Sequence, residues 1–185
     1  MKKILFTLGL ALPLFAQPPF DFKALDDKFD PLTEERTKVT LDGDSLRLAT
    51  HFLGMSDDKD AEALRSLTAN LKGVYVRTWE FDREGKYSKA DIEPFRAYLK
   101  ARQWSKIVES QSGKEVSEVY IQPLPNDRFG GVAIIDAEPR ELTVVYINGA
   151  MNLSDLDKLE GNFGIPDVDL NGGKKPPKEK KDDEE

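Results

Sequence analysis

Hydrophobic positions in this chain follow two different spacings. Before Trp104, apolar residues mostly recur every three or four positions, and after it they gather into short runs separated by turn residues. The first spacing predicts helices and the second predicts strands. Helices are expected over residues 20–36, 44–53 and 92–102, and from Asp57 or Asp58 to Gly73, a glycine suited to ending a helix. A last short helix is expected to begin at Asn152 or Ser154.

The strand candidates are rich in β-branched and aromatic residues and are bounded by turn signals. They comprise a short stretch at 39–41 and longer ones at 74–81, 104–110, 116–122, 131–137 and 142–147. Strands in succession, with helices grouped before and after them, indicate an α+β fold. We therefore predict a single α+β domain whose largely antiparallel sheet has about four to five strands packed against helices.

Two of the strand candidates lack the alternation of a half-exposed strand. Residues 132–135 and 144–147 are apolar at every position. A strand that is apolar on both faces is covered on both faces. The cover is expected to come from helices of this chain, and the alternative is a partner surface formed by a second copy or another protein.

The two ends of the chain differ from its middle. Lys2 and Lys3 precede an apolar run that ends at Ala16, a small residue, which is typical of a secretory signal peptide. That run is too short to span a membrane, so no transmembrane span is expected in the mature chain. Residues 171–185 hold charges, Gly and Pro but no apolar side chain, which predicts a disordered tail. The expected organisation is therefore a signal peptide at 1–16, one domain at 17–170 and a tail at 171–185, in an exported protein that is periplasmic or secreted.

Composition removes several kinds of chemistry. The 185 residues include no Cys and a single His, and the formal net charge is −7. Without Cys the chain has no disulfide, no thiol nucleophile and no N-terminal lipid-attachment site. One His makes a Ser-His-Asp triad or a zinc site with several His ligands difficult to assemble. The acidic balance argues against nucleic acid as a partner.

Three stretches of the sequence are candidates for a functional site, and each also has a structural interpretation. His51 lies in a mostly apolar helical stretch and is interpreted as a structural residue rather than a general base. The acids within 57–62 suit the start of a helix, although they could also bind a hard cation. Residues 167–172 match the first half of an EF-hand loop, but Lys178 stands where the closing Glu should be. We therefore assign no catalytic, metal-binding or cofactor-binding residue and expect no cofactor.

Carboxylate chemistry stays open. With 34 acidic residues the chain contains many carboxylate pairs, and sequence spacing does not show which of them converge in space. If the protein is an enzyme, we expect a concave pocket in which two or more acids meet and have raised pKa values.

Several stretches together resemble a known family. They are Val39–Gly43, LKGVYVRTWEF at 71–81, Tyr87-Ser88 with Glu93-Pro94, WSKIV at 104–108, EPRELTVVYI at 138–147 and LEGNFGIP at 159–166. The chain resembles domain-of-unknown-function family 4252, a group of small exported bacterial proteins. The resemblance implies an α+β domain and export, and it supplies no catalytic residues. Within these stretches, Trp79 and Trp104 are expected to anchor the core.

These observations favour a binding protein over an enzyme. The leading hypothesis is an exported, non-catalytic binding or accessory module of the bacterial cell envelope. Its partner would be a protein or an envelope component, with homo-oligomerisation as one form of binding. The alternative is a hydrolase that uses carboxylates, with or without a divalent metal.

Overall fold

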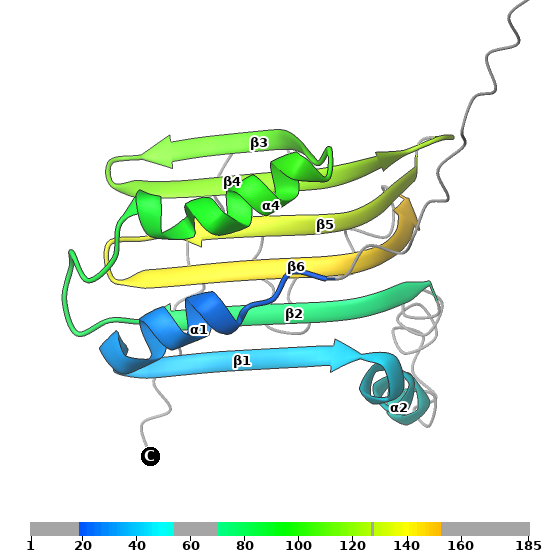
Figure 1. The fold of residues 1–185 in the computed structure, drawn as a ribbon, viewed down its shortest axis with the longest axis horizontal. Coiled ribbons are helices and arrows are strands. Elements are labelled where there is room, and N and C mark those ends of the chain that lie inside the picture. Colours follow the sequence, from blue (N-terminus) through cyan, green and yellow to red (C-terminus); the bar gives the residue numbers. More distant parts are fainter. Residues whose placement is uncertain (1–18, 54–69, 127, 153–185) are drawn as a thin grey trace, which may run out of the picture.

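The architecture is a six-stranded antiparallel sheet with short helices, seen in a computed structural model that describes residues 19–53, 70–126 and 128–152. The strands lie in the order β1-β2-β6-β5-β4-β3 (Figure 1). Their bounds are Glu35–Asp42 (β1), Leu71–Glu80 (β2), Ser105–Ser112 (β3), Glu115–Leu124 (β4), Arg128–Ala137 (β5) and Glu141–Asn152 (β6). The helices are α1 (Lys23–Phe29), α2 (Gly43–Leu53) and α4 (Glu93–Ala101), with single turns η1 (Asp30–Leu32) and η2 (Lys89–Ile92).

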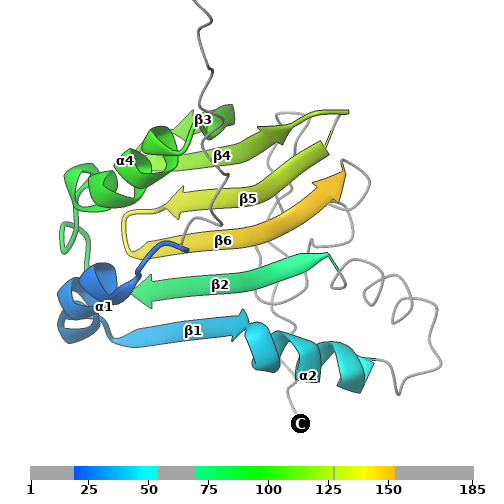
Figure 2. The same ribbon diagram turned by 45° about the vertical axis from the view of Figure 1, so that its right-hand side comes forward.

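Helices α1 and α4 lie on the same face of the sheet, and α2 continues from the end of β1 (Figures 1 and 2). Pro31 lies within η1, immediately after α1, where a proline lacks the N–H that a continuing helix needs. At the start of η2, Ser88 and Asp91 form a reciprocal capping box. Ile92, Phe95 and Leu99 are fully buried and face the sheet.

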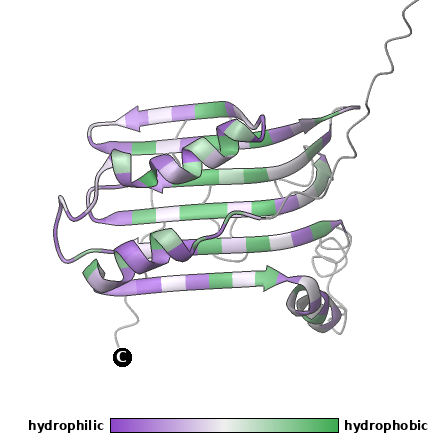
Figure 3. Ribbon diagram, in the orientation of Figure 1, coloured by the Kyte–Doolittle hydropathy of each residue, from purple (hydrophilic) through white to green (hydrophobic). Residues whose placement is uncertain are grey.

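The core lies on both faces of the central strands. On the helical face, aromatic residues of α1, α4, β2 and β6 meet in one cluster that contains Trp79 and Trp104. The opposite face holds a second cluster, mostly aliphatic. Figure 3 shows the long hydrophobic stretches of β5 and β6 that feed the two clusters. In β6, Val144 and Val145 point to opposite faces and both are fully buried within the single chain, as the two-sided apolar pattern predicts.

Each edge strand of the sheet has one place that is unsuited to pairing with a further strand. At the end of β1, the Ser45 hydroxyl accepts a hydrogen bond from the Asp42 N–H (3.0 Å) and donates one to the Asp42 carbonyl (2.7 Å). In β3 the register with β4 shifts between Lys106 and Val108, which leaves Ile107 45% exposed. Side-chain caps and bulges of this kind make an edge a poor template for another strand.

The α+β class, the antiparallel pairing and both tryptophan anchors are confirmed, but the predicted strand number is wrong. The sheet has six strands rather than four to five, because the short stretch expected at 39–41 is an eight-residue strand. Charged and polar residues dominate β1, an edge strand that needs little apolar surface. The helix expected over 20–36 therefore ends early, since Glu35 and Arg36 already belong to β1.

Gly73 was also misassigned. It does not end a helix but lies inside β2, where a Cβ atom would come within 2.7 Å of the Tyr75 ring. A glycine is needed here because the Tyr75 ring folds back over the strand and leaves no room for a side chain. The prediction failed because glycine is equally favoured at the end of a helix. Residues 70–72 of the same predicted helix form a turn and the start of β2, and Asn152 ends β6 rather than beginning a helix. The proposed signal peptide, residues 57–69 of the predicted helix, the last helix beyond Asn152 and the tail lie outside the described residues. Within the described part, no helix is long and apolar enough to cross a membrane.

Candidate functional site

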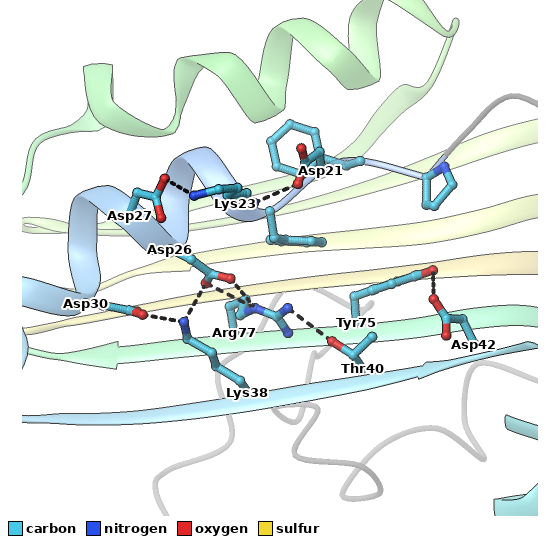
Figure 4. A pocket seen from close by; sticks show the side chains of 13 residues that line it. Asp21, Lys23, Asp26, Asp27, Asp30, Lys38, Thr40, Asp42, Tyr75 and Arg77 are labelled. Atoms are coloured by element: carbon cyan, nitrogen blue, oxygen red, sulfur yellow. Dashed lines mark hydrogen bonds and ion pairs between the residues drawn. The ribbon is translucent and has the colours of Figure 1, made fainter. Parts of the chain in front are cut away.

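A pocket of about 640 Å³ lies between α1 with the residues before it and the strands β1 and β2. Figure 4 shows its lining: α1 forms one wall, and side chains of the two strands form the floor. Residues of β1 with even numbers, among them Lys38, Thr40 and Asp42, face this pocket because alternate strand residues point to the same side. Helix α1 packs on the sheet by burying Leu25 and Phe29, and Asp26 of this helix reaches the side chains of Lys38 and Arg77 on the strands.

Arg77 of β2 forms the floor of the pocket and is only 8% exposed. Its Nε donates to both carboxylate oxygens of Asp26, at 3.2 and 3.4 Å. Its Nη1 donates to the backbone carbonyls of Val39 (2.7 Å) and Val76 (2.9 Å). The remaining Nη2 donates to the Thr40 hydroxyl at 3.1 Å, and the guanidinium lies 5.0 Å from the centre of the Phe22 ring. A buried charge of this kind is tolerated because every nitrogen has an acceptor.

A second cation, Lys38, links α1 to the sheet. Its ammonium contacts Asp30 at 2.5 Å and Asp26 at 3.2 Å. Asp30 also accepts a hydrogen bond from the indole of Trp79 at 3.1 Å. Partial burial opposes ionisation of Asp30, but the hydrogen bonds from Lys38 and Trp79 outweigh it and lower the pKa of this carboxyl.

The far end of the pocket is formed by Tyr75 and Asp42. The Tyr75 hydroxyl donates to Asp42 Oδ2 at 3.0 Å. Burial of the phenol, followed by this hydrogen bond and the nearby carboxylate charge, raises the pKa of Tyr75 to about 12. Tyr75 therefore stays neutral and donates to Asp42 throughout the physiological pH range. Beside it, the Phe22 ring stacks at 6.0 Å and gives this end an apolar wall.

The pocket holds more acid than base. Its lining includes five aspartates, Asp21, Asp26, Asp27, Asp30 and Asp42, and three cations, Lys23, Lys38 and Arg77. Each of the three cations contacts at least one of these carboxylates. The arrangement is thus a partly neutralised pocket with surplus negative charge and aromatic walls. Such a pocket suits binding of a polar ligand.

A second acidic site lies on β1, β2 and β6, where Glu35 is paired with Glu80 and Glu80 with Glu141 across three adjacent strands. These three residues line a pocket of about 340 Å³ together with Glu34, Glu138, Phe81 and one cation, Arg140. Burial, and then the charges of Glu138 and Glu80, raise the pKa of Glu141. Like charges directly opposite one another destabilise a sheet, so this row is an electrostatic cost within the fold.

The candidates from the sequence do not come together in either pocket. His51 is exposed in the last turn of α2, and neither pocket includes it. The acids within 57–62 and the loop at 167–172 lie outside the described residues. Among the described residues, no three metal-ligating side chains gather in a way that could hold an ion. Sequence reasoning missed Arg77, and the available signal was a charge at a position where the strand faces the core.

Comparisons with known proteins give one match. The family model described as Domain of unknown function (DUF4252) matches residues 33–159, which include all six strands. Helix α1 lies before the matched stretch, so the pocket combines strands inside the match with residues outside it. No curated protein and no solved structure matches the chain.

Proposed function

This chain belongs to the DUF4252 family of domains of unknown function, and from that premise we propose that it is an exported, non-catalytic binding or accessory module of the bacterial cell envelope. The export part of this proposal is supported by residues 1–16, in which two lysines precede an apolar run and a small residue. The binding part is supported by the pocket between α1 and the strands β1 and β2.

One observation carries the choice of binding over catalysis. In this pocket, all three groups with displaced pKa values move away from neutrality, Asp30 downward, Lys23 upward and Tyr75 upward to about 12. A general acid or base works best when its pKa lies near the working pH. Asp30 is therefore better suited to act as a fixed charge, and Tyr75 as a hydrogen-bond donor, than to exchange protons with a ligand. Such groups position a ligand rather than react with it.

The proposal is tested on the full chain expressed with its own N-terminus. Mass spectrometry of the periplasmic and secreted fractions should find a product that begins at Gln17. The purified product should then capture a partner from envelope extract or form a defined oligomer in light scattering. A protein that stays in the cytoplasm with Met1 intact would refute the export part. A strict monomer that captures nothing would refute the binding part.

A second candidate function, a carboxylate-based hydrolase, is favoured by the acidic row at Glu141. Its raised pKa and its glutamate neighbours partly match what an acid-base pair requires. The test is a panel of model esters, glycosides and peptides, assayed with and without divalent metal. This function predicts turnover that Glu141→Gln abolishes, and absence of turnover across the panel would refute it.

A further inference from the structure

A short segment without regular secondary structure, residues 19–22, lies between α1 and α4 on the helical face of the sheet (Figures 1 and 2). Its last residue, Phe22, is 4% exposed, and its ring stacks on that of Tyr75, so it belongs to the core. Phe20, two residues earlier, is only partly buried. The segment is therefore anchored at Phe22 and more exposed at Phe20, which also lines the pocket beneath α1.

The Phe20 ring contacts two aromatic side chains of α4. Its centre lies 4.9 Å from that of Phe95 and 5.1 Å from that of Tyr98, in edge-to-face contacts, a favourable arrangement of aromatic rings. The Tyr98 hydroxyl in turn lies 3.1 Å from that of Tyr146 on β6. Because Phe95 and Tyr146 are buried in the core, these three residues form a rigid surface, here called the α4 aromatic site.

Side-chain contacts alone hold Phe20 at this site. In the part of the chain that the structure describes, the backbone of residues 19–21 makes no hydrogen bond with another backbone group, and Pro19 has no N–H to offer. The Asp21 carboxylate accepts a hydrogen bond of 2.9 Å from the first residue of α1, which fixes the helix start rather than Phe20. After the proposed removal of residues 1–16, only three residues precede Phe20. This end of the chain can therefore leave the site without breaking a helix or a strand.

Next to the same site, a buried donor lacks an acceptor. Arg102 follows α4, and its guanidinium lies 3.7 Å from the centre of the Tyr98 ring. Its Nε is buried, yet no described residue accepts a hydrogen bond from it. Buried donors without an acceptor are uncommon in folded proteins. A bound segment that supplied a carbonyl or carboxylate oxygen there would provide the missing acceptor.

We propose that the α4 aromatic site docks an aromatic side chain of a partner protein, and that Phe20 occupies this site until the partner displaces it. This inference rests on the proposed binding function and specifies the chemistry of the partner. Phe20 shows which group the site accepts, a phenyl ring in contact with Phe95 and Tyr98. A partner residue that carries such a ring, with an acceptor for Arg102 beside it, makes the same contacts and adds one. Because the two rings compete for one site, occupancy by Phe20 makes the free chain less receptive.

The experiment uses the full chain and two blocked peptides. Acetyl-PPFD-amide repeats residues 18–21, and acetyl-PPAD-amide lacks the ring. We expect Phe20→Ala to bind the first peptide at least about tenfold more tightly than wild type, whose own Phe20 leaves the site vacant for about a tenth of the time or less. The amide chemical shifts of Phe95 and Tyr146 report binding at this site. The alanine peptide should not bind.

Tyr98→Ala is the matched variant, because it removes the other member of the same ring contact. If Phe20 and Tyr98 only stabilise the fold, both replacements lower Tm and neither strengthens peptide binding. Docking predicts opposite effects: Phe20→Ala strengthens binding, and Tyr98→Ala added to it weakens binding about tenfold, the effect of losing one aromatic contact. Leu48→Ala, which shortens a 55% exposed side chain on α2, controls for a general loss of apolar surface and should bind the peptide as wild type does.

Four results would overturn the docking site. They are equal peptide affinity of wild type and Phe20→Ala, equal binding of the alanine peptide, no weakening by Tyr98→Ala, and a Phe20→Ala chain that does not fold, since Phe20 would then be an indispensable part of the core. Dimerisation of wild type that Phe20→Ala abolishes would identify the occupant as Phe20 of a second copy, and would overturn the assignment to a partner protein.

Failure of this inference can be told apart from failure of the proposed function. In capture from envelope extract, Phe20→Ala should retain more partner than wild type. If the wild-type chain captures a partner and Phe20→Ala captures it equally well, the docking site is refuted and the binding function stands. If the wild-type chain captures nothing and forms no oligomer, the binding function itself is refuted.

Discussion

Replacing Arg77 by methionine tests whether this arginine holds α1 against the sheet. Methionine keeps an unbranched apolar stem beside Phe22 and removes the guanidinium. Asp26 would lose its contacts at 3.2 and 3.4 Å and would keep only the contact with Lys38 at 3.2 Å. The carbonyl of Val39 and the hydroxyl of Thr40 would lose a donor as well.

The expected cost follows from the burial of this ion pair. The side chains of Arg77 and Asp26 are 10% and 20% exposed, so water replaces the lost contacts poorly. Removing one partner of a buried pair costs about 3–5 kcal/mol. Because Lys38 still neutralises Asp26, we expect the lower end, about 3 kcal/mol. For a chain of this size that corresponds to a fall in Tm of about 6–12 °C.

Urea unfolding followed by tryptophan fluorescence measures the change, since Trp79 and Trp104 are both buried in the core. The matched control is Arg47→Met, which breaks an exposed ion pair with Asp44 and should leave the unfolding midpoint unchanged. In a double-mutant cycle, Arg77→Met with Asp26→Leu should cost about 1–2 kcal/mol less than the sum of the single changes. A loss below about 1 kcal/mol for Arg77→Met, or strict additivity, would refute the view that this pair ties α1 to β2.

Three further changes test other parts of the fold. Glu118 is buried, yet Arg96 (2.8 Å) and Lys106 hold its pKa below the ordinary value. Its ionised form therefore stabilises the fold above about pH 5, and this contribution is lost as the pH falls through the pKa of the folded state. In urea, wild type should be more stable than Glu118→Gln at pH 7 and the difference should shrink at pH 3, whereas a difference that does not change with pH would contradict the argument. Glu141 affects stability in the opposite direction, because its pKa is raised in the folded protein and its ionisation therefore destabilises the fold as the pH rises. Glu141→Gln should unfold at a higher urea concentration than wild type at pH 7 but not at pH 4. A variant that is less stable than wild type at pH 7 would refute the electrostatic cost of the glutamate row. Gly131→Ala places a Cβ within 2.5 Å of the Ile147 carbonyl oxygen and should lower stability by about 1–3 kcal/mol in a thermal scan, whereas an unchanged Tm would show that the strands separate freely there.

Strands that bury apolar side chains could be predicted from the sequence, whereas the extent of a strand made mostly of charged and polar residues could not. Strands β5 and β6 are apolar on both faces and their central parts were predicted, but β5 begins three residues before the predicted 131–137 and β6 extends five residues beyond the predicted 142–147. Strand β1 is mostly polar, so the sequence showed only its apolar core at 39–41. Its other residues are extended because β2 pairs with them over the whole stretch from Glu35 to Asp42, and a partner strand leaves no mark on local hydrophobicity.

The pocket could not be predicted for a related reason. Asp26 and Arg77 lie 51 positions apart, and only the packing of α1 on β2 brings them into contact. The charge of Arg77 between apolar residues in the middle of the strand indicated that an acidic partner exists, but many aspartates could have provided it. The fold determines which charged residues far apart in the sequence contact each other, so a site of this kind is identified only from the structure.

The Ser45 hydroxyl and the displaced register at Ile107 have a consequence for how this domain meets other molecules. At these two places an incoming polypeptide cannot simply continue the backbone ladder, a mode of attachment that accepts almost any sequence. Binding at these places must instead depend on contacts between particular side chains of the two molecules. Selectivity can then evolve by single replacements at the surface while the scaffold beneath remains unaltered.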